Sequence, residues 1–202
     1  MNGLETEVKF FVPRPNELRP RILALGAVSA GRVFERNEIF DDPHRTLARR
    51  GELLRIRQDT ACRLTFKQPA GERQHQFKIL REMETTVADG QVLRAVFQAL
   101  GFNLVLVYEK WRETFPIESV HLCLDELPFG HFLEIEGSQA SIRRLTEALS
   151  LPWPQRILGT YHDLFAIVAE EMGLGFRDIT FENFQGLKVD PGLYRHRFEA
   201  GA

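Results

Sequence analysis

The chain has 202 residues, a length that suits one large domain, and a hydrophobic content of 44%, which is enough for a buried core. Its net charge of −2 argues against a nucleic-acid-binding protein held by excess positive charge, and no apolar run is long enough to span a membrane. With two cysteines and no recognisable signal peptide, the sequence favours a reduced, cytoplasmic protein over a disulfide scaffold.

The hydrophobic pattern predicts strands and helices in the following order. A strand at 4–10 is followed by a helix at 16–27, capped by Asn16, and a strand at 32–41. Strands at 53–58 and 63–67 form a hairpin, and a long strand follows at about 76–87. A helix capped by Asp89 ends at Gly101. Strands at 104–115, 120–126 and 132–136 then precede helices at 138–149 and 159–172. Long consecutive strand pairs with few helices predict an α+β fold with an antiparallel sheet.

The end of the chain is harder to interpret. Residues 176–184 are apolar enough to dock on the core, whereas 186–202 are expected to form a loosely attached tail. We therefore expect a single domain at 1–185 followed by that tail.

Charged residues at spacing two mark one face of almost every predicted strand. Glu5, Glu7 and Lys9 would leave the same face of the first strand, because side chains alternate along a strand. The same spacing gives the full set: Glu5, Glu7, Lys9, Arg55, Arg57, Arg63, Lys67, Lys78, Glu82, Glu84, Lys110, Arg112, Asp125, Glu134 and Glu136.

A solvated sheet face is the simpler explanation for any single pair, since charged residues are mostly exposed. The whole set favours the opposite arrangement, because a solvent face normally avoids like charges stacked on one strand. If the sheet closes with these charges inside, its edges disappear and its apolar outer face can pack against the helices. The sequence therefore predicts a polar, charged tunnel.

The chemistry of the two signs suggests two roles. Carboxylates suit a hard cation such as Mg²⁺ or Mn²⁺, and lysines and arginines suit phosphate oxygens. The candidate catalytic residues and preferred metal ligands are Glu5, Glu7, Glu134 and Glu136, with Glu82, Glu84 and Asp125 as further metal ligands. The candidate substrate-binding residues are Lys9, Arg55, Arg57, Lys67, Lys78, Lys110 and Arg112.

Six segments in this order resemble the CYTH superfamily, also called triphosphate tunnel metalloenzymes. They are Glu5-x-Glu7-x-Lys9, Leu54-Arg55-Ile56-Arg57, Leu64-Thr65-Phe66-Lys67, Arg81-Glu82-Met83-Glu84, Lys110-Trp111-Arg112, and Leu124-Asp125 continued through Phe132-Leu133-Glu134-Ile135-Glu136. A weaker match follows at Thr160-Tyr161-His162-Asp163-Leu164, where Tyr161 is equally well explained by core packing. The resemblance implies an eight-stranded antiparallel tunnel that binds a small-molecule triphosphate and one or two divalent cations.

The resemblance implies three activities: class IV adenylyl cyclase, thiamine triphosphatase, and inorganic or nucleoside triphosphatase. The segments Leu100-Gly101-Phe102, Phe40-Asp41-Asp42-Pro43 and Gly130-His131-Phe132 look most like the cyclase branch, which is therefore preferred. A non-catalytic sensor of polyphosphate or nucleotide is a further alternative, although it has less need for so many carboxylates. A homodimer is compatible with these expectations.

Overall fold

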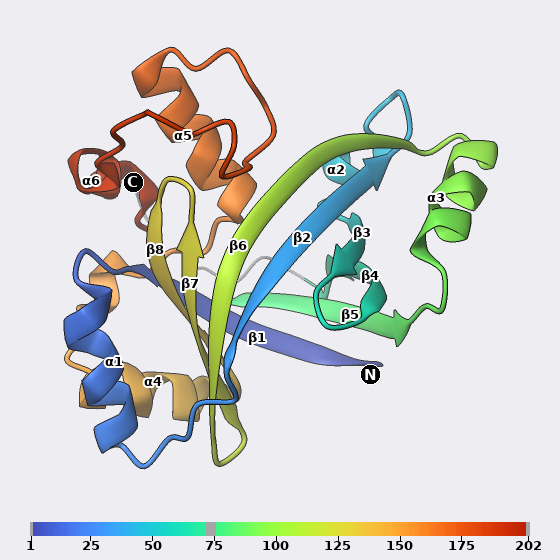
Figure 1. Cartoon of the computed structure of the whole chain (residues 1–202). Helices are drawn as coiled ribbons and strands as arrows, with labels where there is room; N and C mark the ends of the chain where they lie inside the picture. The colour runs from blue at the N-terminus through green and yellow to red at the C-terminus, as the bar shows by residue number, and fades with distance from the viewer. Residues whose placement is uncertain (1, 72–75, 201–202) are drawn as a thin grey trace.

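The computed structural model describes residues 2–71 and 76–200, and its main feature is a closed barrel (Figure 1). Within these residues the barrel consists of β1 (Asn2–Phe11), β2 (Arg32–Asp41), β3 (Leu53–Gln58), β4 (Cys62–Pro69), β5 (Lys78–Thr86), β6 (Asn103–Ile117), β7 (Val120–Leu127) and β8 (Gly130–Glu136). The strands follow one another around the barrel as β1-β5-β4-β3-β2-β6-β7-β8, and every neighbouring pair is antiparallel. The predicted α+β fold with an eight-stranded antiparallel barrel is confirmed.

The helices are α1 (Pro15–Ala24), α2 (Thr46–Arg49), α3 (Gly90–Ala99), α4 (Gln139–Ala148), α5 (Tyr161–Met172) and α6 (Arg195–Phe198), with short 3-10 turns at Trp153–Gln155 and Pro191–Tyr194. Asp89 caps α3 as predicted, because its side chain accepts hydrogen bonds from the backbone N–H groups of Gln91 and Val92. The cap predicted for the first helix is wrong. Arg14 occupies that position and Pro15 is the first helical residue, where the fixed φ of proline suits a helix.

Apolar side chains on the outside of the barrel form the core. One cluster joins α1 and α4 to the outer faces of β1 and β8, with Ile22, Ile142 and Ile135 fully buried. A second cluster, rich in phenylalanine, lies under α5 and α6, and a third lies under α3. Figure 1 shows these helices around the barrel, with α3 far from the other two groups. Burying the apolar outer face in this way leaves the charged face inside.

The final residues differ from the loosely attached tail expected at 186–202. Phe198 is only 5% exposed within the second cluster, and the N–H of Ala200 donates to the carbonyl of Arg156 over 2.8 Å. Arg197 forms an ion pair with Glu170 of α5. The described part of this segment is therefore packed on the molecule, because isolated aromatic residues supply anchors that a periodicity search does not detect. The segment at 176–184 docks as expected through Ile179, which bridges to Tyr108 of β6.

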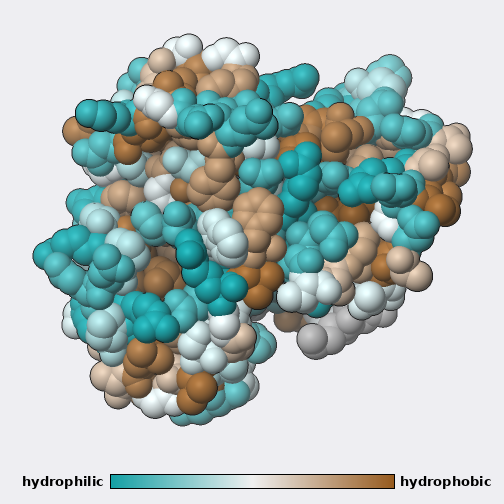
Figure 2. Space-filling model, viewed as in Figure 1, coloured by the Kyte–Doolittle hydropathy of each residue, from teal (hydrophilic) through white to brown (hydrophobic). Residues whose placement is uncertain are grey.

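Hydrophilic residues cover much of the face seen in Figure 2, with smaller apolar patches between them. Some apolar side chains of the barrel's outer face stay exposed where no helix covers them, as at Leu4 and Met83. Among the described residues, no helix combines the length and apolar character needed to cross a bilayer.

Candidate active site

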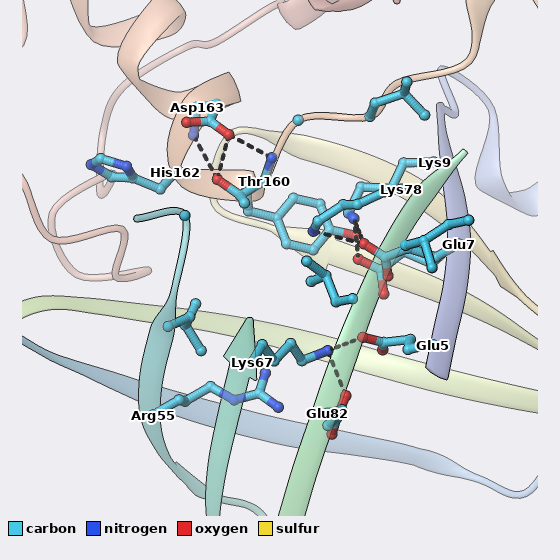
Figure 3. Close-up of a pocket in the computed structure, with 18 of the residues that line it drawn as sticks. Glu5, Glu7, Lys9, Arg55, Lys67, Lys78, Glu82, Thr160, His162 and Asp163 are labelled. Atoms are coloured by element: carbon cyan, nitrogen blue, oxygen red, sulfur yellow. Dashed lines mark hydrogen bonds and ion pairs between the residues drawn. The ribbon is translucent and has the colours of Figure 1, made fainter. Parts of the chain in front are cut away.

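A cavity of about 1260 Å³ occupies the inside of the barrel and is lined by charged side chains from its strands (Figure 3). It is larger than the roughly 300–1,000 Å³ of ordinary small-molecule pockets. Thirteen of the fourteen predicted site residues line it: Glu5, Glu7, Lys9, Arg55, Arg57, Lys67, Lys78, Glu82, Glu84, Lys110, Arg112, Glu134 and Glu136. The structure thus brings into one space residues that the sequence distributes from Glu5 to Glu136.

Three carboxylates form a compact group within this cavity. Glu5, Glu7 and Glu136 each offer one oxygen, and these oxygens lie within 4.8 Å of one another. The group is held by strand pairing, since Glu7 on β1 stands opposite Glu136 on β8. Carboxylate oxygens at such spacing are the donor set that Mg²⁺ or Mn²⁺ prefers, with water and phosphate completing the coordination. The residues present therefore fit a divalent cation, and we call them the carboxylate triad.

The electrostatics of the triad are unfavourable without a cation. Burial raises the pKa of Glu136 to about 7, opposed by Arg112 and reinforced by Glu134, Glu5 and Glu7. Burial and the neighbouring Glu7 also raise the pKa of Glu5. For Glu7 the raising effect of burial is outweighed by Lys78 and Lys9, which hold its pKa well below the ordinary value. Glu7 is thus held in its charged form, whereas Glu5 and Glu136 resist ionisation beside it.

The other four predicted metal ligands lie against basic residues. Glu82 pairs with Lys67 at 2.7 Å, Glu84 with Arg57 at 3.1 Å, and Glu134 with Lys9 at 3.3 Å. Like Glu5 and Glu7, these carboxylates have basic partners, but they lie outside the triad.

Asp125 is the one predicted site residue that the structure places away from the cavity wall. It does not line the cavity, and its fully buried carboxylate accepts hydrogen bonds from Lys110 at 2.9 Å, from Arg112 at 2.6 Å and from the hydroxyl of Tyr161 at 2.7 Å. Both oxygens are occupied by donors. The residue therefore anchors two bases, and it lies outside the carboxylate triad.

The lysines of the tunnel are held by its carboxylates. The Lys67 ammonium lies 2.5 Å from Glu5, and the Lys78 ammonium lies 2.8 Å from Glu7. Lys9 also contacts Glu7, at 2.6 Å. Acids and bases of the interior therefore neutralise one another, which offsets the cost of burying them.

The two neighbouring arginines of β3 differ in their partners. Arg55 donates to the hydroxyls of Tyr108 and Thr65, both over 3.2 Å. Arg57 faces the carboxylates of Glu84 and Glu35, and Arg55 approaches the same Glu84 less closely, at 3.8 Å. Both guanidinium groups are largely buried, as expected for phosphate-binding groups inside a tunnel.

Sequence reasoning missed the contribution of β2. Glu35 is buried between Arg57 at 3.8 Å and Lys110 at 3.6 Å, and these bases help to lower its pKa to about 2 against the raising effect of burial. Asn37 is fully buried on the same face, and within the described part of the chain its amide makes no hydrogen bond. Spacing two along 32–41 puts both residues on the inner face of β2, although neither lines the cavity.

The cysteine on the interior face has no basic activating partner of its own. Burial raises the pKa of the Cys123 thiol despite the opposing charge of Arg112. A raised pKa keeps the thiol protonated, which disfavours a role as a nucleophile.

The family described as CYTH domain matches residues 3–152, well over half of the chain. The chain belongs to the CYTH domain family. A protein of Methanocaldococcus jannaschii named as a candidate adenylate cyclase is 28% identical to this CYTH protein over 148 residues, covering 72% of this chain and 83% of that one.

Solved structures share the fold of this CYTH protein. A candidate adenylate cyclase from Vibrio parahaemolyticus superposes with a TM-score of 0.71 at 19% identity, covering 82% of this chain and 99% of that one. A candidate adenylyl cyclase from Hippeastrum, described as having a dominant triphosphatase activity, gives 0.60 at 17% identity and covers 85% and 96%. The family match and the relative from Methanocaldococcus jannaschii identify the chain as an enzyme.

Proposed function

We propose that this protein is a divalent-metal-dependent enzyme that binds a small-molecule triphosphate in its tunnel and acts as a class IV adenylyl cyclase, forming cyclic AMP and pyrophosphate from ATP. The observation that carries the proposal is the carboxylate triad set among lysines and arginines in one cavity. The named relative from Methanocaldococcus jannaschii supports the cyclase reaction.

The triad would hold Mg²⁺ or Mn²⁺, which when bound neutralises charge on phosphate oxygens and acidifies a bound hydroxyl. Around it, Lys9, Lys67 and Lys78 bind phosphate oxygens as point charges, and the Arg55 guanidinium grips them as a planar fork. Because these groups are carried by paired strands, the triphosphate is held in a fixed orientation.

Cyclisation then needs the ribose 3′-hydroxyl in line with the α-phosphorus. The bond from O3′ to that phosphorus forms while the bond to the bridging oxygen of the β-phosphate breaks. Pyrophosphate leaves with the negative charge that the tunnel bases stabilise, and the hydroxyl proton passes to a carboxylate or to water.

A second candidate is a triphosphatase acting on thiamine triphosphate, tripolyphosphate or a nucleoside triphosphate. The dominant triphosphatase activity named for the Hippeastrum neighbour favours it. The same tunnel charges would serve attack of water on the terminal phosphorus. A non-catalytic polyphosphate or nucleotide sensor is less well supported, because binding alone needs the lysines and arginines but has less need of the carboxylate triad.

The deciding assay supplies ATP, thiamine triphosphate and tripolyphosphate in parallel, each with Mg²⁺ or Mn²⁺, and measures cyclic AMP, pyrophosphate and phosphate. Equal amounts of cyclic AMP and pyrophosphate from ATP are expected. Phosphate without cyclic AMP would identify the triphosphatase instead, and tight binding without turnover would identify the sensor. In the same assay, replacing the buried triad residue Glu7 by glutamine should lower turnover, whereas Glu17→Gln, which changes an exposed carboxylate of α1, is the matched control and should not.

A further inference from the structure

The C-terminal extension from Trp153 onward lies beyond the residues matched by the family, yet it forms part of the cavity wall. The first turn of α5 reaches the tunnel there. Its geometry is fixed by a capping box, in which Thr160 accepts from the N–H of Asp163 and the Asp163 carboxylate accepts from the N–H of Thr160 at 2.7 Å (Figure 3). Tyr161 directly follows the cap residue Thr160 as the first residue of α5, so its direction is fixed, and its side chain lines the cavity.

The hydroxyl and the ring of Tyr161 both contact charged groups. The hydroxyl donates to Asp125 over 2.7 Å, and that carboxylate also holds Lys110 and Arg112. The ammonium groups of Lys9 and Lys110 lie 5.5 and 5.3 Å from the centre of the ring, within the range of cation–π attraction. One side chain therefore connects two lysines that approach the tunnel from β1 and β6.

An aromatic face holds a lysine differently from a carboxylate. Lys9 already contacts Glu7 and Glu134, and Lys110 already contacts Asp125 and Glu35. A further carboxylate would neutralise these ammonium groups, whereas a neutral ring attracts them and leaves their charge available to a ligand. Core packing alone does not account for the hydroxyl, since phenylalanine would fill the same space against Phe132.

We propose that Tyr161 is a positioning residue for triphosphate binding, through which the C-terminal extension orients Lys9 and Lys110 towards the phosphates. This inference rests on the proposed function. It extends the site to a segment beyond the matched domain and assigns the tyrosine a role that acts through other residues.

The test is calorimetric titration of tripolyphosphate with Mg²⁺ into the wild type and two variants, with thermal unfolding measured on each protein. Tyr161→Phe keeps the ring but loses the hydroxyl, and should weaken binding about fivefold. Tyr161→Leu loses both contacts and should weaken it about thirtyfold. A matched control is Phe165→Leu, which removes a buried ring of the same helix and cluster that does not line the cavity. It should lower the melting temperature and leave the affinity unchanged.

A double-mutant cycle that combines Tyr161→Phe with Lys110→Gln separates a positioning role of Tyr161 from a purely structural one. If Tyr161 acts through that lysine, the double variant Tyr161→Phe with Lys110→Gln should lose less affinity than the sum of the losses of the two single variants. Additive losses would overturn the proposal, and so would a Tyr161→Phe protein that binds as tightly as the wild type. A wild type that binds no tripolyphosphate would instead refute the proposed function, and this inference with it.

Discussion

Replacing Arg57 tests the inward orientation of the charges through both stability and binding. Its guanidinium lies 3.1 Å from Glu84, 3.4 Å from Asp59 and 3.8 Å from Glu35, and its side chain is only 15% exposed. Removing one member of a buried ion pair commonly costs about 3–5 kcal/mol, because the other charge stays buried.

The expected cost in the free energy of unfolding is smaller here, because each carboxylate keeps another basic neighbour. Glu35 retains Lys110, and both Asp59 and Glu84 retain Arg63. Arg57→Ala should therefore lower the free energy of unfolding by about 2 kcal/mol, and Arg57→Lys by about 1 kcal/mol, since lysine keeps the charge and loses the planar fork. Removing Arg57 also removes its repulsion of the neighbouring Arg55, which would favour the folded state. Losing the three contacts with carboxylates outweighs that gain.

Binding should fall by a similar free energy. If Arg57 contacts phosphate, Arg57→Ala should weaken tripolyphosphate binding by about 1.5–3 kcal/mol, or roughly tenfold to more than a hundredfold. Urea unfolding and calorimetric titration measure the two effects. The control is Arg81→Ala, which removes an exposed arginine from β5 and should change unfolding by less than about 0.5 kcal/mol. Wild-type stability and affinity in Arg57→Ala would place its side chain outside the barrel and refute the reasoning.

Three further predictions concern the carboxylate triad. Turnover of any triphosphate should be lost in excess chelator and restored by Mg²⁺ or Mn²⁺, because bare carboxylates repel the substrate; undiminished turnover would exclude the metal. Glu7→Gln should lower turnover far more than it lowers the melting temperature, whereas Asp125→Asn, which disturbs an anchor of two bases, should lower both. Burial raises the pKa of Glu136 to about 7 in the folded protein, whereas in the unfolded chain the same carboxyl ionises above about 4.5. Between these two pH values the folded protein holds a proton that the unfolded chain has lost. In chelator Glu136 alone should therefore make the free energy of unfolding fall by about 3 kcal/mol as the pH rises from 4.5 to above 7. Glu136→Gln should make this slope much shallower in urea titrations at several pH values, and the part that remains belongs to Glu5, whose pKa is also raised.

The sequence predicts the barrel well because alternation is a local property of each strand. Glu5 and Glu7 reveal their shared face without knowledge of any neighbour, and the same holds for Arg55 and Arg57. Packing helices onto the outer face then follows from its apolar residues.

Pairings between distant elements could not be predicted in this way. Asp125 follows the same alternating pattern as the other acids. Its hydrogen-bond partner Tyr161 comes from a helix 36 residues later, so this contact exists only in the folded chain. Phe198 likewise anchors the end of the chain through contacts with distant residues. The exact triad was also beyond the sequence, which preferred Glu5, Glu7, Glu134 and Glu136 but gave no distances that would separate Glu134 from the other three.

The ion pairs of the interior mean that the protein carries its own counterions. Each lysine next to the triad is now held by one of its carboxylates, as Lys67 is by Glu5 and Lys78 by Glu7. A cation that takes up those carboxylates would release the lysines, and a polyphosphate that takes up the lysines would release the carboxylates. The two ligands should therefore exchange partners with the tunnel, and each should tighten the binding of the other by the same factor. In such a site affinity is a property of the pair of ligands, and neither binds strongly alone.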